Sequence, residues 1–202
     1  MNIFHCDIKL LITLFGLCIY ACLGCGEDLT STEETSVEPR SDEGTVTPTE
    51  MYWVDLISGS EWRIADPTED PYMTMRAERD LCTITDFGEE YGGLEVSTVY
   101  CDYATLVQPI DEEIHPGDMI EVIIWHSPLV SEIPAQGEIS LSLSGETLWS
   151  KHLEIPGAAQ SWNITFESSF SAPQGELITF HVHNHGANAY TLLSVRRGRP
   201  LD

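Results

Sequence analysis

Short segments in which apolar and polar residues alternate recur along residues 51–202, and a period of two predicts β-strands. In residues 161–167 the apolar side chains are Trp162, Ile164 and Phe166, with polar residues between them. Similar segments return about every 8–12 residues and are separated by turn-forming Gly, Pro, Asn and Ser. The predicted strands are 93–98, 118–126, 138–143, 147–155, 161–167, 176–184 and 190–196. Residues 57–90 are less regular and predict only a mixture of short strands and loops.

This spacing favours one all-β fold, an antiparallel two-sheet sandwich, because no segment carries the sustained 3.6-residue apolar period of a helix.

The N-terminal 50 residues follow other patterns. Residues 10–23 form an apolar run of 14 residues, which suits the core of a signal peptide and is too short to span a membrane. Residues 26–50 hold one Leu, two Val and no aromatic residue, so they cannot bury enough apolar surface to fold. We therefore expect a signal peptide at 1–24, a disordered acidic tether at 25–50 and a sandwich domain at 51–202.

The end of the apolar run resembles the lipobox of bacterial lipoproteins, in which a cysteine is acylated and becomes the new N-terminus. A small residue, Gly24, precedes Cys25, and acidic residues follow it closely. Cys22 is the alternative acylation site, and cleavage without acylation is a second alternative. The resemblance implies a lipid anchor in the cell envelope, and Gly26 after Cys25 favours the outer membrane over the inner one.

Two cysteines remain once the signal peptide is removed and Cys25 is acylated. They are Cys82 and Cys101. A lone pair of cysteines in an exported protein should be oxidised. The alternative, two thiols in a metal or redox site, lacks the C-x-x-C spacing. The sequence therefore predicts a disulfide between Cys82 and Cys101.

Net charge narrows the function classes. A formal charge of −24 makes nucleic acid an improbable partner, because phosphate binding needs clustered Lys and Arg. The same charge repels anionic lipid headgroups, so membrane attachment should depend on acyl chains. The chain also lacks G-x-S-x-G, H-E-x-x-H and a Gly-rich phosphate loop, so we do not expect an enzyme.

The order of turns and strands from 93 to 196 resembles the galactose-binding-like jelly rolls, especially bacterial carbohydrate-binding modules. The segment 104–110 is followed by an Ile-x-Pro-Gly-Asp type of turn at 114–118, a long strand ending near Trp125 and a closing hairpin at 180–195. The resemblance implies a two-sheet jelly roll, often with a structural calcium ion, and a sugar site built from aromatic residues. The His-rich hairpin departs from this pattern, and no calcium ligand is assigned.

Histidines gather in the closing hairpin. Alternate side chains of a strand share a face, so Val182 should point to the core, and His181 and His183 should stand about 7 Å apart outside it. Two such imidazoles can share zinc or copper if His185, in the turn, or His126, at the end of another strand, supplies a third ligand. The alternative is a wet polar face without a metal.

Aromatic and polar residues suggest a different ligand. Trp125 should lie on the outer face of its strand, where an exposed indole beside polar groups is a platform on which sugars stack. Ordinary packing of Trp125 against a loop is the alternative. The candidate ligand-binding residues are Trp125, His126, His181, His183, Asn184 and Tyr190. We expect non-catalytic binding with carbohydrate as the leading ligand; a metal-binding envelope protein or a purely structural one are the alternatives.

Overall fold

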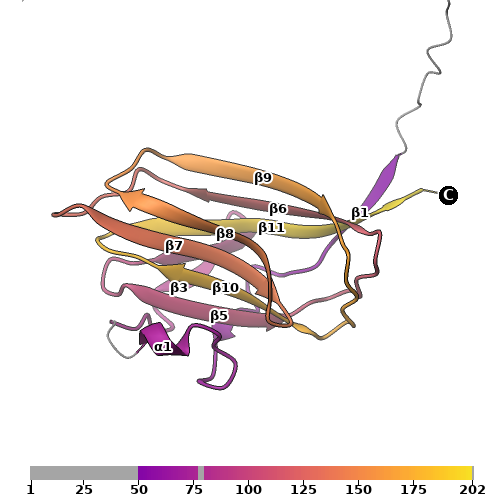
Figure 1. Ribbon diagram of the computed structural model, residues 1–202, viewed down its shortest axis with the longest axis horizontal. Coiled ribbons are helices and arrows are strands. Elements are labelled where there is room, and N and C mark those ends of the chain that lie inside the picture. The colour runs from indigo at the N-terminus through magenta and orange to yellow at the C-terminus, as the bar shows by residue number, and fades with distance from the viewer. Residues whose placement is uncertain (1–49, 77–79, 202) are drawn as a thin grey trace, which may run out of the picture. The chain divides into compact units, whose positions relative to one another are not determined.

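The computed structural model describes residues 50–76 and 80–201 (Figure 1). The predicted signal peptide, both candidate acylation sites and all of the tether except Glu50 lie outside these residues. Within the described part of the chain, no helix has the length and apolar character needed to cross a membrane.

Two antiparallel sheets make up the domain. The six-stranded sheet has the order β3-β4-β11-β6-β9, and β1 pairs with the remaining length of β11. Its strands are β1 (Met51–Asp55), β3 (Phe87–Glu90), β4 (Gly93–Ser97), β6 (Met119–His126), β9 (Gln160–Glu167) and β11 (Ala189–Pro200). The five-stranded sheet has the order β2-β5-β10-β7-β8. Its strands are β2 (Arg63–Ile64), β5 (Tyr103–Pro109), β7 (Ala135–Leu143), β8 (Glu146–Ile155) and β10 (Leu177–His183).

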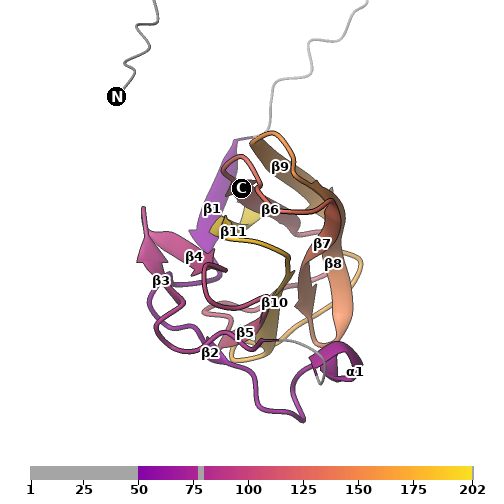
Figure 2. The same cartoon turned by 90° about the vertical axis from the view of Figure 1, so that its left-hand side faces the viewer.

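The pairings are nested along the chain, which defines the jelly roll. β7 pairs with β8, β6 with β9, β5 with β10 and β4 with β11, so each outer pair encloses the next. Eight antiparallel strands folded in this way form a double-sheet jelly roll. Figure 2 shows the sandwich end-on, with β6 and β11 across the core from β10 and β5. The predicted fold class is confirmed. Among the described residues of the irregular stretch 57–90, the structure has β2, β3 and one short helix, α1 (Met73–Arg76).

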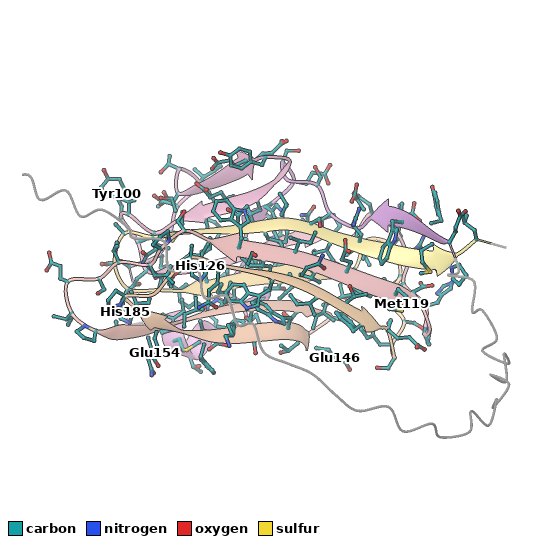
Figure 3. All side chains as sticks on the ribbon, turned by 90° about the horizontal axis from the view of Figure 1, so that it is seen from above. Tyr100, Met119, His126, Glu146, Glu154 and His185 are labelled. Atoms are coloured by element: carbon teal, nitrogen blue, oxygen red, sulfur yellow. A yellow bond between two sulfur atoms is a disulfide. The ribbon has the colours of Figure 1, made fainter. Side chains whose placement is uncertain are left out.

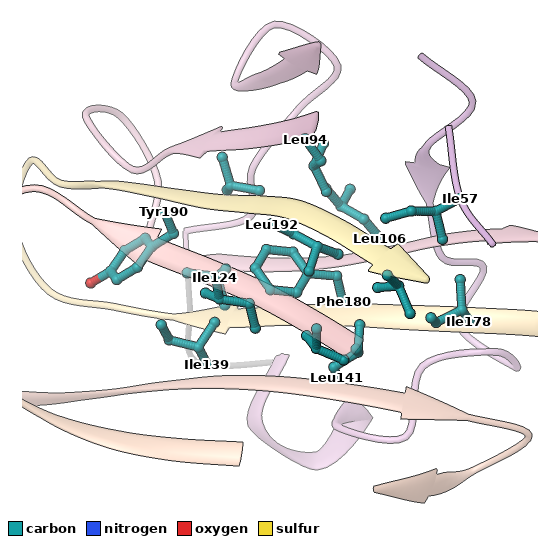
Figure 4. Close-up of a cluster of buried hydrophobic side chains, with 14 of the residues drawn as sticks. Ile57, Leu94, Leu106, Ile124, Ile139, Leu141, Ile178, Phe180, Tyr190 and Leu192 are labelled. Carbon is teal, nitrogen blue, oxygen red and sulfur yellow. The ribbon is translucent and has the colours of Figure 1, made fainter. Parts of the chain in front are cut away.

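The core lies between the two sheets and follows from the alternation along each strand. On β6, the buried residues Ile120, Val122 and Ile124 alternate with half-buried ones. They meet side chains such as Phe180 and Leu141 of the opposite sheet in one hydrophobic cluster (Figure 4). Removing such side chains from water is the main force that holds the layers together.

A segment before β3 covers part of the outer face of the five-stranded sheet. Tyr72, just before α1, stacks on His181 of β10, and its hydroxyl lies 2.5 Å from Ser140 Oγ of β7. The disulfide between Cys82 and Cys101 closes the C-terminal end of this segment, as the sequence predicts. The disulfide therefore helps to hold a covering layer against β5 and β10.

Candidate functional site

His181 lies on the predicted side of β10, but the expectation that it stands exposed is wrong. Its exposed fraction is 0% because the Tyr72 ring stacks on it at 3.9 Å and the Tyr103 ring meets it edge-on at 4.9 Å. Thr105 Oγ1 shares a hydrogen bond with His181 Nδ1 at 2.9 Å. Burial lowers the pKa of His181 to about 3, against an opposing effect from Asp70. The imidazole is therefore neutral and forms part of the internal packing.

The predicted metal ligands do not converge. His183 is half-buried beside His185, with ring centroids 5.4 Å apart, whereas His126 lies on the core face of the six-stranded sheet against Trp162. Since the core separates His126 from the outer face that carries His181, these two histidines cannot share one ion. Within residues 50–76 and 80–201, no group of three or more His, Cys, Asp or Glu side chains could hold a metal ion. The zinc, copper and calcium expectations thus find no such ligand set in that part of the chain.

The expected closing hairpin at 180–195 is wrong, because β10 and β11 lie in different sheets and do not pair with each other. Asn184 and Tyr190 are buried in a hydrogen-bond network at the connection between these two strands. Asn184 Nδ2 donates to Thr98 Oγ1 at 2.6 Å, and Asn188 Nδ2 donates to Asn184 Oδ1 at 3.0 Å. The Tyr190 hydroxyl also donates to Asn184 Oδ1, and burial raises the pKa of this phenol. Both side chains have an exposed fraction of 0%, so neither lies on a surface that a ligand can reach without rearrangement.

Trp125 lies where the alternation predicts, on the outer face of β6. In the sheet register it stands between Thr191 of β11 and Ser161 of β9. The indole is half-buried: its neighbours Ile124 and His126 point to the core, and Trp125 itself faces outward. Figure 3 shows the molecule from the side of the six-stranded sheet, with Met119 and His126 labelled at the two ends of β6. Trp125 therefore keeps the exposure that a binding role requires.

A surface hollow of about 370 Å³ adjoins the Trp125 indole. Its lining residues are Trp125, His126, Ser127, Pro128, Ala159, Gln160 and Ser161. His126 adds little accessible surface, because it is 1% exposed and its Nδ1 lies 2.6 Å from the Ser127 carbonyl oxygen. The hollow thus combines an aromatic wall and a proline with the exposed polar side chains of Gln160 and Ser161. Apolar concave surfaces with a few polar groups are the usual form of small-ligand sites.

Only Trp125 and His126 of this hollow were candidates from the sequence, and the polar residues Gln160 and Ser161 are among those that sequence reasoning missed. They belong to β9, 35 and 36 residues after Trp125, and only the pairing of β6 with β9 brings them to the indole. The outward-facing position of Ser161 follows from the alternation with Trp162, but the identity of the neighbouring strand does not.

Acidic side chains form a second group, beside β3 and β4. Asp86, Glu89, Glu90 and Glu95 line a hollow of about 170 Å³ beside β3 and β4. Burial and the neighbouring Glu90 carboxyl raise the pKa of Glu95 to about 7. The pair therefore holds a proton at near-neutral pH, which offsets part of its mutual repulsion.

No protein-family model matches the chain, and no curated protein sequence is similar to it. Several solved structures are similar in fold. A carbohydrate-binding module described as recognising mannan, TmCBM27, is 10% identical; the match covers 75% of this chain and 99% of that one with a TM-score of 0.44. The cleaved adhesin domain K3 of Lys-gingipain from Porphyromonas gingivalis is 10% identical over 73% and 99% of the two chains, with a TM-score of 0.41.

A third module, TmCBM61, whose structure contains β-1,4-galactotriose, is 12% identical over 71% of this chain and 92% of that one, with a TM-score of 0.36. Similarity at this level does not define a ligand for this chain. The class that the strands themselves establish is a jelly-roll β-sandwich with a half-buried tryptophan at a surface hollow.

Proposed function

We propose that this protein is a non-catalytic glycan-binding protein whose primary contact is Trp125. The observation that carries the proposal is the position of the indole, half-buried on the outer face of β6 at the edge of the 370 Å³ hollow. The C–H face of a pyranose ring packs on an indole, while nearby polar side chains hydrogen-bond its hydroxyl groups. Gln160 and Ser161 supply such groups in the hollow.

The negative charge of the chain favours uncharged sugars over anionic ones as ligands. At a formal charge of −24, the protein repels sulfated glycans and polyuronates. We therefore expect neutral oligosaccharides or polysaccharides to be bound.

An array of neutral and anionic glycans probed with the full chain tests this function. We expect binding to neutral glycans, a loss of about tenfold or more in Trp125→Ala, and no binding to polygalacturonate. Tyr52→Ala serves as the matched control, since Tyr52 is 59% exposed and lines neither the Trp125 hollow nor its rim. Equal binding by Trp125→Ala and the wild type would place the site elsewhere and refute the proposal.

We also propose that the protein is exported and held in the cell envelope by acylation of Cys25, with Cys22 as the alternative, in the outer membrane of its cell. The lipobox-like sequence supports this location, and so does the Cys82–Cys101 disulfide, because such bonds persist in oxidising compartments. Metabolic labelling with a palmitate analogue tests it. Cys25→Ala should abolish the label while Cys22→Ala retains it, and label in neither the wild type nor Cys22→Ala would refute the anchor.

A further inference from the structure

A second hollow, of about 390 Å³, opens on the same side of the six-stranded sheet. It arises because β4 and β1 share one edge of β11 without meeting. β4 pairs with β11 as far as Leu192, and β1 pairs with it only from Arg196 onward. A β-bulge between Leu192 and Ser194 also shifts the register of β11 against β6, opposite Ile123. Bulges re-aim side chains and are over-represented beside functional sites.

An exposed aromatic residue stands at the rim of this hollow. Tyr91 and Gly92 connect β3 to β4 with φ angles of 54° and 82°, the signs required at both central positions of a type I′ turn. Asn, Asp and Gly are the residues that such a turn favours, whereas a ring-bearing residue adopts a positive φ at a steric cost. The Tyr91 side chain is nevertheless 76% exposed, so its ring gains little from packing that would offset this cost. Backbone strain of this kind gathers at ligand-binding positions.

The wall of the hollow carries a guanidinium held in a fixed position. Arg196 Nε donates to Glu121 Oε1 at 2.9 Å, and the Arg196 guanidinium carbon lies 5.4 Å from the centre of the Trp53 ring. Asp55 is the partner of Arg196 in the β1–β11 register and also lines the hollow. An arginine fixed in this way presents its remaining N–H groups without the entropy cost of ordering a free side chain.

Ser194 adds a hydroxyl group to the same wall. Its Oγ is buried and has no hydrogen-bond partner in the described part of the chain. Because this oxygen is buried, a ligand in the hollow would contact it only after a rearrangement, so it is not counted among the binding groups. The hollow thus combines an aromatic ring, a fixed guanidinium and a carboxylate, which are groups of the kinds that stack on sugars and hydrogen-bond their hydroxyls.

We infer that the Tyr91 hollow is a second glycan subsite and that the ligand is an extended neutral sugar chain contacting Trp125 and Tyr91 together. The inference rests on the proposed glycan-binding function. Trp125 lies two residues from Ile123 on one face of β6, and Ile123 lines the second hollow. Tyr91 precedes β4, which lies two strands away from β6, so its position is two spacings of about 4.8 Å across the sheet and at least about 7 Å along it from Trp125. The two residues are therefore separated by roughly 12 Å or more. This span exceeds one monosaccharide, so only an oligosaccharide or polysaccharide can contact both rings.

Calorimetric titration of the full chain with three series of sugars tests the inference. The probes are manno-, cello- and β-1,4-galacto-oligosaccharides, each from the monosaccharide to the hexasaccharide. Tyr91→Asn removes the ring and places in the turn a residue that this turn favours, so its fold should be retained. Tyr91→Gly is the second variant of the same kind. Tyr100→Asn is the matched control, since Tyr100 is an 86% exposed tyrosine that lines neither hollow.

In at least one series, we expect the hexasaccharide to bind more tightly than the disaccharide. Tyr91→Asn should weaken hexasaccharide binding about five- to tenfold and leave disaccharide binding unchanged. Tyr100→Asn should change neither. If Trp125→Ala abolishes binding while both Tyr91 variants bind the hexasaccharide as the wild type does, the second subsite is wrong and the proposed function stands. If no series binds to the wild type, or if neither ring affects binding, both proposals fail.

Discussion

The buried network at the connection between β10 and β11 gives the sharpest prediction about stability. Asn184 and Tyr190 are both 0% exposed. Tyr190→Phe removes one hydroxyl donor, but Asn184 Oδ1 still accepts from Asn188 Nδ2 at 3.0 Å, so no buried acceptor is stranded. The cost in unfolding free energy should therefore be that of a single hydrogen bond, about 1 kcal/mol.

Asn184→Ala removes far more from the same network. It deletes the donor to Thr98 Oγ1 and to the Gly186 carbonyl oxygen, each at 2.6 Å, and leaves the buried Tyr190 hydroxyl without its acceptor. Thr98 Oγ1 still accepts from the Asn188 backbone N–H, and the Gly186 carbonyl still accepts from Thr98 Oγ1, so only the Tyr190 hydroxyl is stranded. At about 1 kcal/mol for each of the two lost donor bonds and about 1–3 kcal/mol for the stranded hydroxyl, the unfolding free energy should fall by about 3–5 kcal/mol. The two variants should therefore differ clearly, although the side chains are in direct contact.

Urea unfolding at pH 7, followed by tryptophan fluorescence, measures both differences, and the exposed Tyr100→Phe is the control that should change nothing. Glycan binding by Tyr190→Phe should equal that of the wild type, because the phenol is buried. Equal stability of Asn184→Ala and Tyr190→Phe would refute the network argument. A loss of glycan binding by Tyr190→Phe at unchanged stability would show instead that Tyr190 contacts the ligand, as the sequence predicts.

Two further predictions concern the segment that covers the five-stranded sheet. Replacing Cys82 and Cys101 by Ser should lower the unfolding free energy by about 3 kcal/mol, because the disulfide joins residues 19 apart in sequence. Urea unfolding of the variant and of the oxidised wild type measures this difference, and an unchanged unfolding midpoint would contradict it. Burial lowers the pKa of His181 to about 3; the charge of Asp70 opposes this effect and His183 adds to it. Below pH 6.5, the ordinary pKa of histidine, the unfolded chain therefore binds a proton that the folded chain does not. The unfolding free energy should thus fall between about pH 6.5 and pH 3, and this group should account for a loss of about 3 kcal/mol at pH 4. His181→Gln should lose that part of the pH dependence. If the unfolding free energies of the two proteins instead change with pH in parallel, His181 is not the cause.

Local alternation predicted seven of the strands and the side of the strand on which most of their residues lie, but it missed β1 and β5. Six of the seven residues of β5 are buried, so no alternation marks that strand. Phe180 and Val182 lie in the core and Trp125 faces outward, as a period of two requires. The same alternation places His181 on the outer side of β10 but cannot say whether another segment covers that side. Tyr72 covers it, and Tyr72 lies in the stretch whose pattern is least regular.

The candidate site was predicted only in part, because its residues come together through pairings between distant strands. Trp125 is recognisable from its own strand, whereas Gln160 approaches it only through the pairing of β6 with β9. The Tyr91 hollow depends on two strands far apart in sequence sharing one edge of β11, and on a bulge that a pattern of apolar residues does not reveal.

The sequence by itself determined the all-β class, the sandwich and the pairing of Cys82 with Cys101, because these follow from periodicity and from a count of cysteines. The tertiary structure alone decided which polar side chains reach solvent. Burial depends on what packs over a face, and the covering segment reaches His181 from more than 100 residues earlier in the chain. His181 and His126 are therefore buried in the packing, whereas Trp125 on the outer face of the six-stranded sheet remains partly exposed.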